Sequence, residues 1–196
     1  VRRRRAFRRP EQLRRPDAMC LRVGTRPVIL VVRNEVASAR LTYLVAHEMG
    51  HIMSGHLKAD SNEVLVDDTL PVDDQGCAQD RDEKVADAYA IELLGGDKLK
   101  AAGKALAPMD ADEVKLVVAA LSASKGAGLD AGQVILTWAR QSKDWKVAGM
   151  AMRYLMTTGA APLVINDAAR KVINPEELSE DGLDHLSQLT GNEGAE

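Results

Sequence analysis

The motif H-E-x-x-H, formed by residues His47 to His51, constrains the fold of this 196-residue chain more than any other feature. It lies within a segment, residues 35–58, whose apolar side chains recur every three or four positions, as on the buried face of an α-helix. Residues four apart lie one above the other on a helix, so both imidazoles can reach a single metal ion. The motif therefore predicts a helix that carries two metal ligands, with Glu48 as the general base for a metal-bound water.

A catalytic zinc site needs three protein ligands, and this helix supplies only two. His56 follows the first ligand by nine residues, on the other side of a continuous helix, so we expect it to be exposed at the helix end rather than to bind metal. The alternative source is the pattern E-x-x-A-D at residues 83–87, within a second expected helix. Glu83 and Asp87 are one helical turn apart, so Glu83 can bind the metal while Asp87 accepts a hydrogen bond from the outer nitrogen of a ligand histidine.

These two segments, VAHEMGHIMSGH and RDEKVADAYAIELL, resemble the corresponding helices of the ImmA/IrrE zinc-dependent endopeptidases, which are minimal gluzincins. The resemblance covers about residues 26–95. It implies one zinc ion per chain held by His47, His51 and Glu83, with Glu48 as the general base and Asp87 at the family's Asn/Asp position. A valine, Val85, stands where the family commonly has a second glutamate, and we expect little effect because the matched ligand is the first.

The expected activity is the hydrolysis of a peptide bond in a protein substrate. Members of the resembled family often cleave a helix-turn-helix transcriptional repressor, which makes such a repressor the expected partner. A second hypothesis is a metal-site regulatory protein that acts on DNA or on a protein partner through the segment Arg2–Arg15. This segment carries eight arginines and one acidic residue, although the whole chain has a net charge of −3. Because like charges repel, we expect residues 1–20 to form a disordered basic arm.

The predicted fold class is α+β and mostly helical. Only two Trp, three Tyr and one Phe are present, so aliphatic side chains, with Tyr43, must form the core, which favours packed helices. The β-branched run Val28–Val32 predicts a buried strand whose edge can pair with an extended substrate. We expect a zincin-like core over residues 21–100, in which a short sheet packs on the two motif helices, followed by a C-terminal helical region over 101–196. Helices are expected at 80–94, 110–124, 130–142, 145–157 and 175–190.

The compartment follows from two absences in the sequence. No apolar run approaches the roughly 20 residues that span a bilayer, so no membrane segment is expected. The two cysteines cannot form a disulfide framework, which favours a reducing cytoplasm.

A long acidic loop is expected over residues 59–79, with a short strand at 64–66. Cys77 lies at the end of this loop, six residues before Glu83. Thiolate is a strong zinc ligand, so Cys77 is a candidate inhibitory fourth ligand that would keep an enzyme latent until the loop moved or the thiol was oxidised. The alternative is a small residue packed at the start of the helix, as free cysteines often are.

Overall fold

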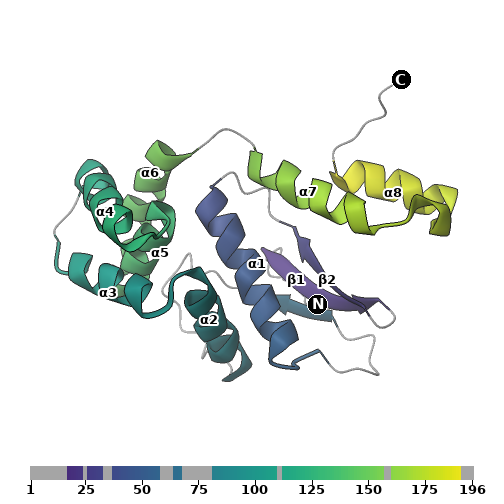
Figure 1. The fold of residues 1–196 in the computed structure, drawn as a ribbon, viewed down its shortest axis with the longest axis horizontal. Coiled ribbons are helices and arrows are strands. Elements are labelled where there is room, and N and C mark those ends of the chain that lie inside the picture. The colour runs from purple at the N-terminus through teal and green to yellow at the C-terminus, as the bar shows by residue number, and fades with distance from the viewer. Residues whose placement is uncertain are drawn as a thin grey trace, which may run out of the picture. The chain divides into compact units, whose positions relative to one another are not determined.

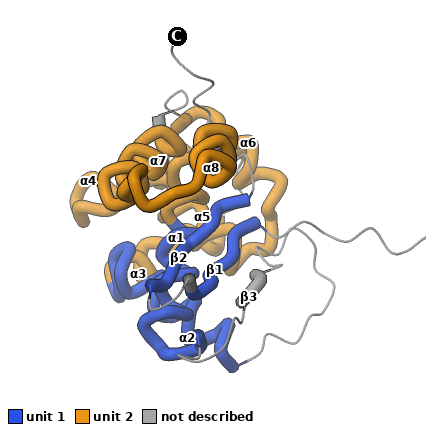
Figure 2. Tube along the Cα trace, turned by 90° about the vertical axis from the view of Figure 1, so that its right-hand side faces the viewer, with its two compact units in different colours: residues 1–34, 43–97 blue, residues 35–42, 98–196 orange. Residues whose placement is uncertain are grey.

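The computed structural model describes residues 17–23, 26–32, 37–57, 64–67, 81–109, 112–156 and 160–190. Over these ranges the chain is mostly helical and has one small antiparallel sheet, as the predicted class requires (Figure 1). The chain divides into two compact units (Figure 2): unit 1 takes in the described residues within 1–34 and 43–97, and unit 2 those within 35–42 and 98–196. No described helix is long and apolar enough to cross a membrane.

The sheet of unit 1 has three strands in the order β2-β1-β3. They are β1 (Ala18–Val23), β2 (Arg26–Val31) and β3 (Val64–Asp67). Both pairings are antiparallel, and Cys20 of the central strand lies opposite Ile29 of β2 and Leu65 of β3. The expected strands at 28–32 and 64–66 are therefore both present.

The structure corrects the sequence analysis of this sheet at two points. The strand expected to be buried, β2, lies at the edge, and its Leu30 is 39% exposed. The central strand, β1, was not expected, because residues 18–20 were assigned to the basic arm. Its side chains alternate between buried Ala18 and Cys20 and partly exposed Met19 and Leu21, as in a strand with one covered face. Since all four are apolar, this alternation is absent from the sequence pattern.

Two helices of unit 1 carry the motifs: α1 (Ser38–Met53) and α2 (Arg81–Leu94). Their backbones come into direct contact at Gly50, where an added Cβ would lie 2.7 Å from the Cα and 2.8 Å from the carbonyl oxygen of Ala86. Only glycine allows this approach, and the small, fully buried Ala86 completes it. The contact lies between the two motifs and brings Glu83 to the histidines of α1.

Substitution of Gly50 by alanine should lower the free energy of unfolding by about 1–3 kcal/mol, because its methyl group would force α1 and α2 apart. The matched control is Gly149→Ala, in helix α6 (Trp145–Leu155), where an added Cβ meets no atom within 4 Å. That change should stabilise the protein by about 0.5–1 kcal/mol. Denaturant unfolding of the two variants measures both values, and equal effects would contradict the close contact of the helices.

Unit 2 is helical in its described residues. It contains α4 (Glu113–Ala127), α5 (Ala131–Ser142), α6, α7 (Ala160–Val172), a 3₁₀ turn η1 (Pro175–Glu177), α8 (Glu180–Thr190) and most of α3 (Gly96–Leu106). An aspartate caps the start of α4, α5 and α6, where Asp112, Asp130 and Asp144 each accept a backbone N–H. These three helices pack together, and Trp138 of α5 donates to the carbonyl of Leu106 at 3.0 Å.

The helices expected at 110–124, 130–142 and 145–157 correspond to α4, α5 and α6. The sequence analysis missed α3 and α7. The glycine pair at 95–96 does end α2, but α3 begins on the second glycine. In α7, Pro162 is the third residue, a position where proline needs no intrahelical N–H bond. The single helix expected at 175–190 is divided into η1 and α8, because the Ser179 hydroxyl caps the start of α8 by accepting the N–H of Gly182.

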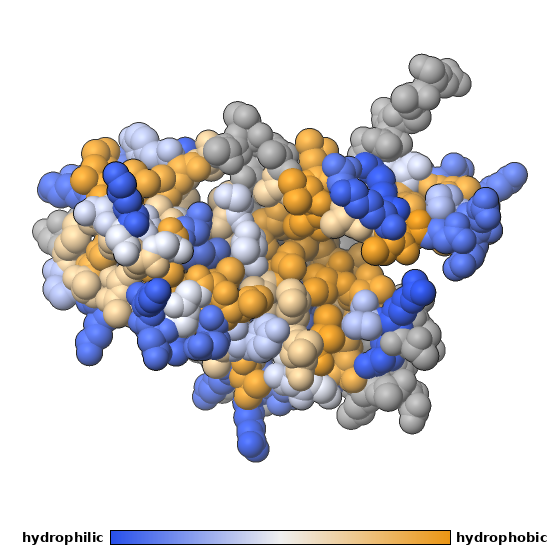
Figure 3. All heavy atoms as spheres, viewed as in Figure 1, coloured by the Kyte–Doolittle hydropathy of each residue, from blue (hydrophilic) through white to orange (hydrophobic). Residues whose placement is uncertain are grey.

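Unit 2 also holds a pocket of about 320 Å³, lined by the first turn of α1, by residues of α4, α5 and α6 such as Ser124 and Met152, and by Asp130, which caps α5. Hydrophobic side chains reach the surface on the face seen in Figure 3. The exposed large apolar residues of this unit include Leu163, Val164 and Val172 of α7.

Candidate metal centre

Three side chains of unit 1 converge on one point between α1 and α2. His47 Nε2 lies 3.1 Å from Glu83 Oε2, His51 Nε2 lies 3.3 Å from Glu83 Oε1, and the two Nε2 atoms are 3.1 Å apart. In a tetrahedral zinc site, with bonds of about 2.1 Å, neighbouring ligand atoms are about 3.4 Å apart. The donor atoms of these three residues therefore lie close enough together for the residues to hold one metal ion.

The side chains of this cluster are more buried than charged or polar groups usually are. Both histidines are 3% exposed, and Glu83 keeps about a quarter of its side chain accessible. Hydrogen bonds with His47 and His51 lower the pKa of Glu83 to about 2, so that its carboxyl is ionised at neutral pH. An ionised carboxylate and two imidazoles with Nε2 directed inward are donors that zinc and other transition metals accept.

The outer nitrogen of His47 is held by a carboxylate. His47 Nδ1 lies 3.0 Å from Asp87 Oδ1, and the buried Tyr43 donates its hydroxyl proton to the same oxygen. With a metal in the centre, a partner on Nδ1 would keep the ring hydrogen there and leave the Nε2 lone pair for the ion. The structure thus brings Asp87 to the position that the E-x-x-A-D pattern suggested, and it adds Tyr43 as the group that holds Asp87.

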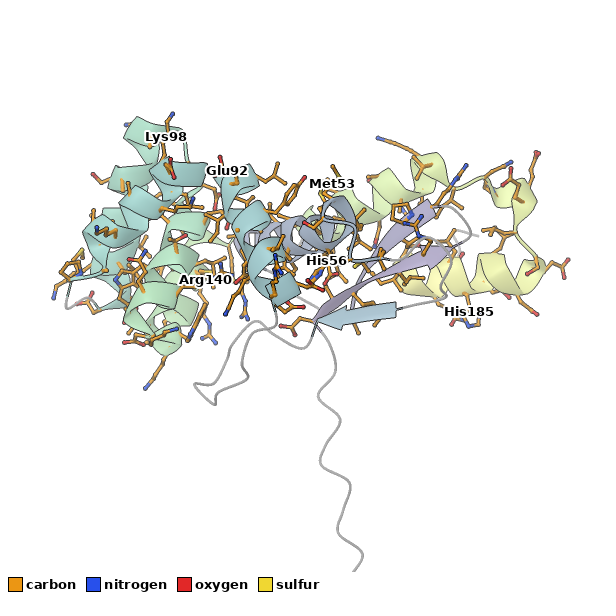
Figure 4. The ribbon with its side chains drawn as sticks, turned by 90° about the horizontal axis from the view of Figure 1, so that it is seen from below. Met53, His56, Glu92, Lys98, Arg140 and His185 are labelled. Carbon is orange, nitrogen blue, oxygen red and sulfur yellow. The ribbon has the colours of Figure 1, made fainter. Side chains whose placement is uncertain are left out.

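The outer nitrogen of His51 is held by His56, a residue that the sequence analysis placed at an exposed helix end. This expectation is wrong: the two Nδ1 atoms lie 2.9 Å apart, and the His56 side chain is 11% exposed. The sequence analysis placed His56 on a continuous helix, but α1 ends at Met53, and Gly55 then adopts a positive φ of 74°. In Figure 4, Met53 marks the end of α1, and His56 lies close by.

The general-base candidate Glu48 is buried within unit 1, with 1% of the residue exposed. The thiol of Cys20, which is fully buried on β1, lies close enough to the Glu48 carboxylate to feel its charge. Burial raises the pKa of Cys20 far above its usual range, and the nearby Glu48 carboxylate raises it further. Cys20 therefore remains a neutral thiol that can donate to Glu48. The sequence analysis missed this contact because it did not identify β1.

Two sequence-based predictions fall outside the described residues. Cys77, the candidate inhibitory ligand, lies in the stretch 68–80, and the arginines of the basic arm lie in the stretch 1–16. Both therefore stay predictions.

Comparison with known proteins finds no match: no family model matches the sequence, and no curated protein or solved structure is significantly similar to it. Two imidazoles and a carboxylate can hold a metal ion, two further side chains hold the imidazoles, and a buried carboxylate lies next to them in the sequence.

Proposed function

We propose that this protein is a zinc-dependent endopeptidase of the ImmA/IrrE type. The observation that carries the proposal is the convergence of His47, His51 and Glu83, from two separate helices, with the buried Glu48 next to His47 in the sequence. The small sheet, α1 and α2 support a zincin-like arrangement for this core. Two imidazoles and one carboxylate also serve iron enzymes, but a glutamate directly after the first histidine is the signature of metal-dependent peptide hydrolysis.

Each residue of the centre has a defined task in this reaction. Zinc, when bound by the three ligands, supplies a Lewis acid that polarises the scissile carbonyl and makes water a better nucleophile. Glu48 accepts the proton of the attacking water and then delivers it to the leaving amine. The neutral thiol of Cys20 lies near the Glu48 carboxylate, while Asp87 and Tyr43 hold the ring of His47 in the orientation that a ligand needs.

The substrate is proposed to be a protein that presents an extended segment. Strand β2 lies at one end of the sheet order and pairs with β1 alone among the described strands. A strand edge of this kind can take up a peptide backbone by adding it as a further strand. The resemblance to the ImmA/IrrE family extends this proposal to a helix-turn-helix repressor, cleaved at one exposed segment.

The proposal predicts proteolysis that depends on the metal. Purified protein should carry about one zinc ion per chain and should produce a small set of new N-termini in a repressor or cell extract, measured by mass spectrometry. Chelation should abolish these termini, and added zinc should restore them. Equal digestion of unrelated unfolded proteins would contradict the narrow specificity. Absence of any zinc-dependent cleavage would instead favour a regulatory protein that acts through its arginine-rich N-terminal segment.

A further inference from the structure

Both imidazoles of the proposed zinc centre have a partner on the outer nitrogen, and the partner of His51 is another imidazole. The rings of His51 and His56 meet edge to face, with their centroids 5.1 Å apart and their Nδ1 atoms 2.9 Å apart. On its far side, His56 Nε2 lies 3.5 Å from Asp82 Oδ1 of α2. Three residues thus form a line from the centre to the surface: His51, His56 and Asp82.

The positions of the ring hydrogens on His51 and His56 follow from the valence of imidazole. A neutral imidazole that binds metal through Nε2 carries its hydrogen on Nδ1. His51 Nδ1–H can therefore only donate, and His56 Nδ1 must accept. The remaining hydrogen of His56 then lies on Nε2, which faces the Asp82 carboxylate. One metal–nitrogen bond at His51 thus determines the tautomer of both rings.

We propose that His56 is a positioning residue of the zinc centre: it accepts the Nδ1–H of His51 and so holds that ring with its Nε2 directed at His47 and Glu83. The inference rests on the proposed zinc centre and assigns a role that the H-E-x-x-H and E-x-x-A-D patterns do not include. Asp82 contributes less, because its side chain is 55% exposed and water screens its charge.

The turn after α1 brings His56 back to His51. Gly55 N–H bonds to the carbonyl of Ile52 at 3.1 Å, and His56 N–H bonds to the carbonyl of His51 at 3.0 Å. These are the two hydrogen bonds of a Schellman motif. The motif needs a residue in the left-handed conformation at the position that Gly55 occupies, and glycine adopts this conformation readily. His51 and His56 are thereby joined by two hydrogen bonds, one between their backbones and one between their rings.

Zinc affinity, measured by competition with a chelator of known affinity, tests the proposal without a substrate. His56→Ala should weaken zinc binding about 10- to 100-fold. His56→Asn should recover part of this loss, because its amide oxygen can accept from His51. The matched control is His185→Ala, an exposed histidine of α8, which should bind zinc as the wild type does.

A second pair of variants changes no side chain of the centre. Gly55→Val and Gly128→Val both place a branched residue at a helix end with positive φ, 74° and 67°, and both have open space around the new side chain. The two should lose similar stability from the strained backbone. Only Gly55→Val should also weaken zinc binding, because only there does the strained turn carry His56.

Nitrogen-15 NMR of histidine-labelled, zinc-loaded protein reads the tautomers directly. The expected signals are an Nδ1–H on His51 and an Nε2–H on His56. The inference fails if His56→Ala binds zinc as tightly as the wild type, or if His56 carries its hydrogen on Nδ1. Wild-type protein that binds no zinc would instead refute the proposed function, so the two failures are distinguishable.

Discussion

Replacing Glu48 with glutamine should lower the rate of peptide cleavage by about 10²- to 10⁴-fold, which is the usual contribution of a general base. Glutamine has nearly the same shape but cannot accept the proton of the attacking water. Because Glu48 is fully buried against β1, no solvent base can readily take its place. Zinc content should stay at about one ion per chain, since the three ligands are unchanged.

The measurement is the initial rate of appearance of the new N-terminus, with zinc content determined on the same sample. Glu176→Gln, a change of the same kind at an exposed site in η1, should leave the rate unaltered. If Glu48→Gln retained cleavage at the control rate, Glu48 would not be the base. If the biological effect of the protein survived without cleavage, the regulatory-protein hypothesis would be preferred.

The second large effect is expected for Glu83→Ala, which should reduce zinc affinity by at least about a hundredfold. This lower bound follows because loss of a ligand costs more than loss of a residue that only orients one, for which 10- to 100-fold is typical. Alanine would leave two imidazoles with no charged donor, and it would also remove the carboxylate that bridges His47 and His51.

Chelator competition measures this affinity, and Glu92→Ala provides the control. Glu92 is an exposed carboxylate of the same helix, so its loss should not alter zinc binding. Tight stoichiometric zinc in the Glu83→Ala protein would remove Glu83 from the centre. The candidate for the third ligand would then have to come from elsewhere in the chain.

The part of the site that was predictable from sequence is the part that regular helices determine. The four-residue spacing of His47 and His51 places both rings on one face of α1, and the same spacing relates Glu83 to Asp87 on α2. The spacing alone could not establish that the two faces meet. Gly50 and Ala86 make that contact, and their small size is the only trace of it in the sequence.

The residues that were missed lie where the chain leaves a regular element. His56 was placed by extending α1 past its true end, although Gly55 is a recognised signal for a helix that stops and turns back. Cys20 was missed because β1 is short and entirely apolar on the stretch 18–21, so its two faces cannot be told apart by hydropathy. Backbone reversal and tertiary burial, rather than residue type, determined both positions.

The distance along the chain between the two ligand-bearing helices has a consequence for folding. His47 and Glu83 are 36 residues apart, so an ion that binds both closes a long loop, much as a covalent cross-link would. A disulfide across a loop of this length would disfavour the unfolded chain by about 4 kcal/mol through lost entropy. The metal would thus stabilise the fold of unit 1 in addition to its part in catalysis. Chelation should therefore lower the melting temperature along with the activity. In a cell, a chain that had not yet acquired its ion would then be both inactive and more open to degradation.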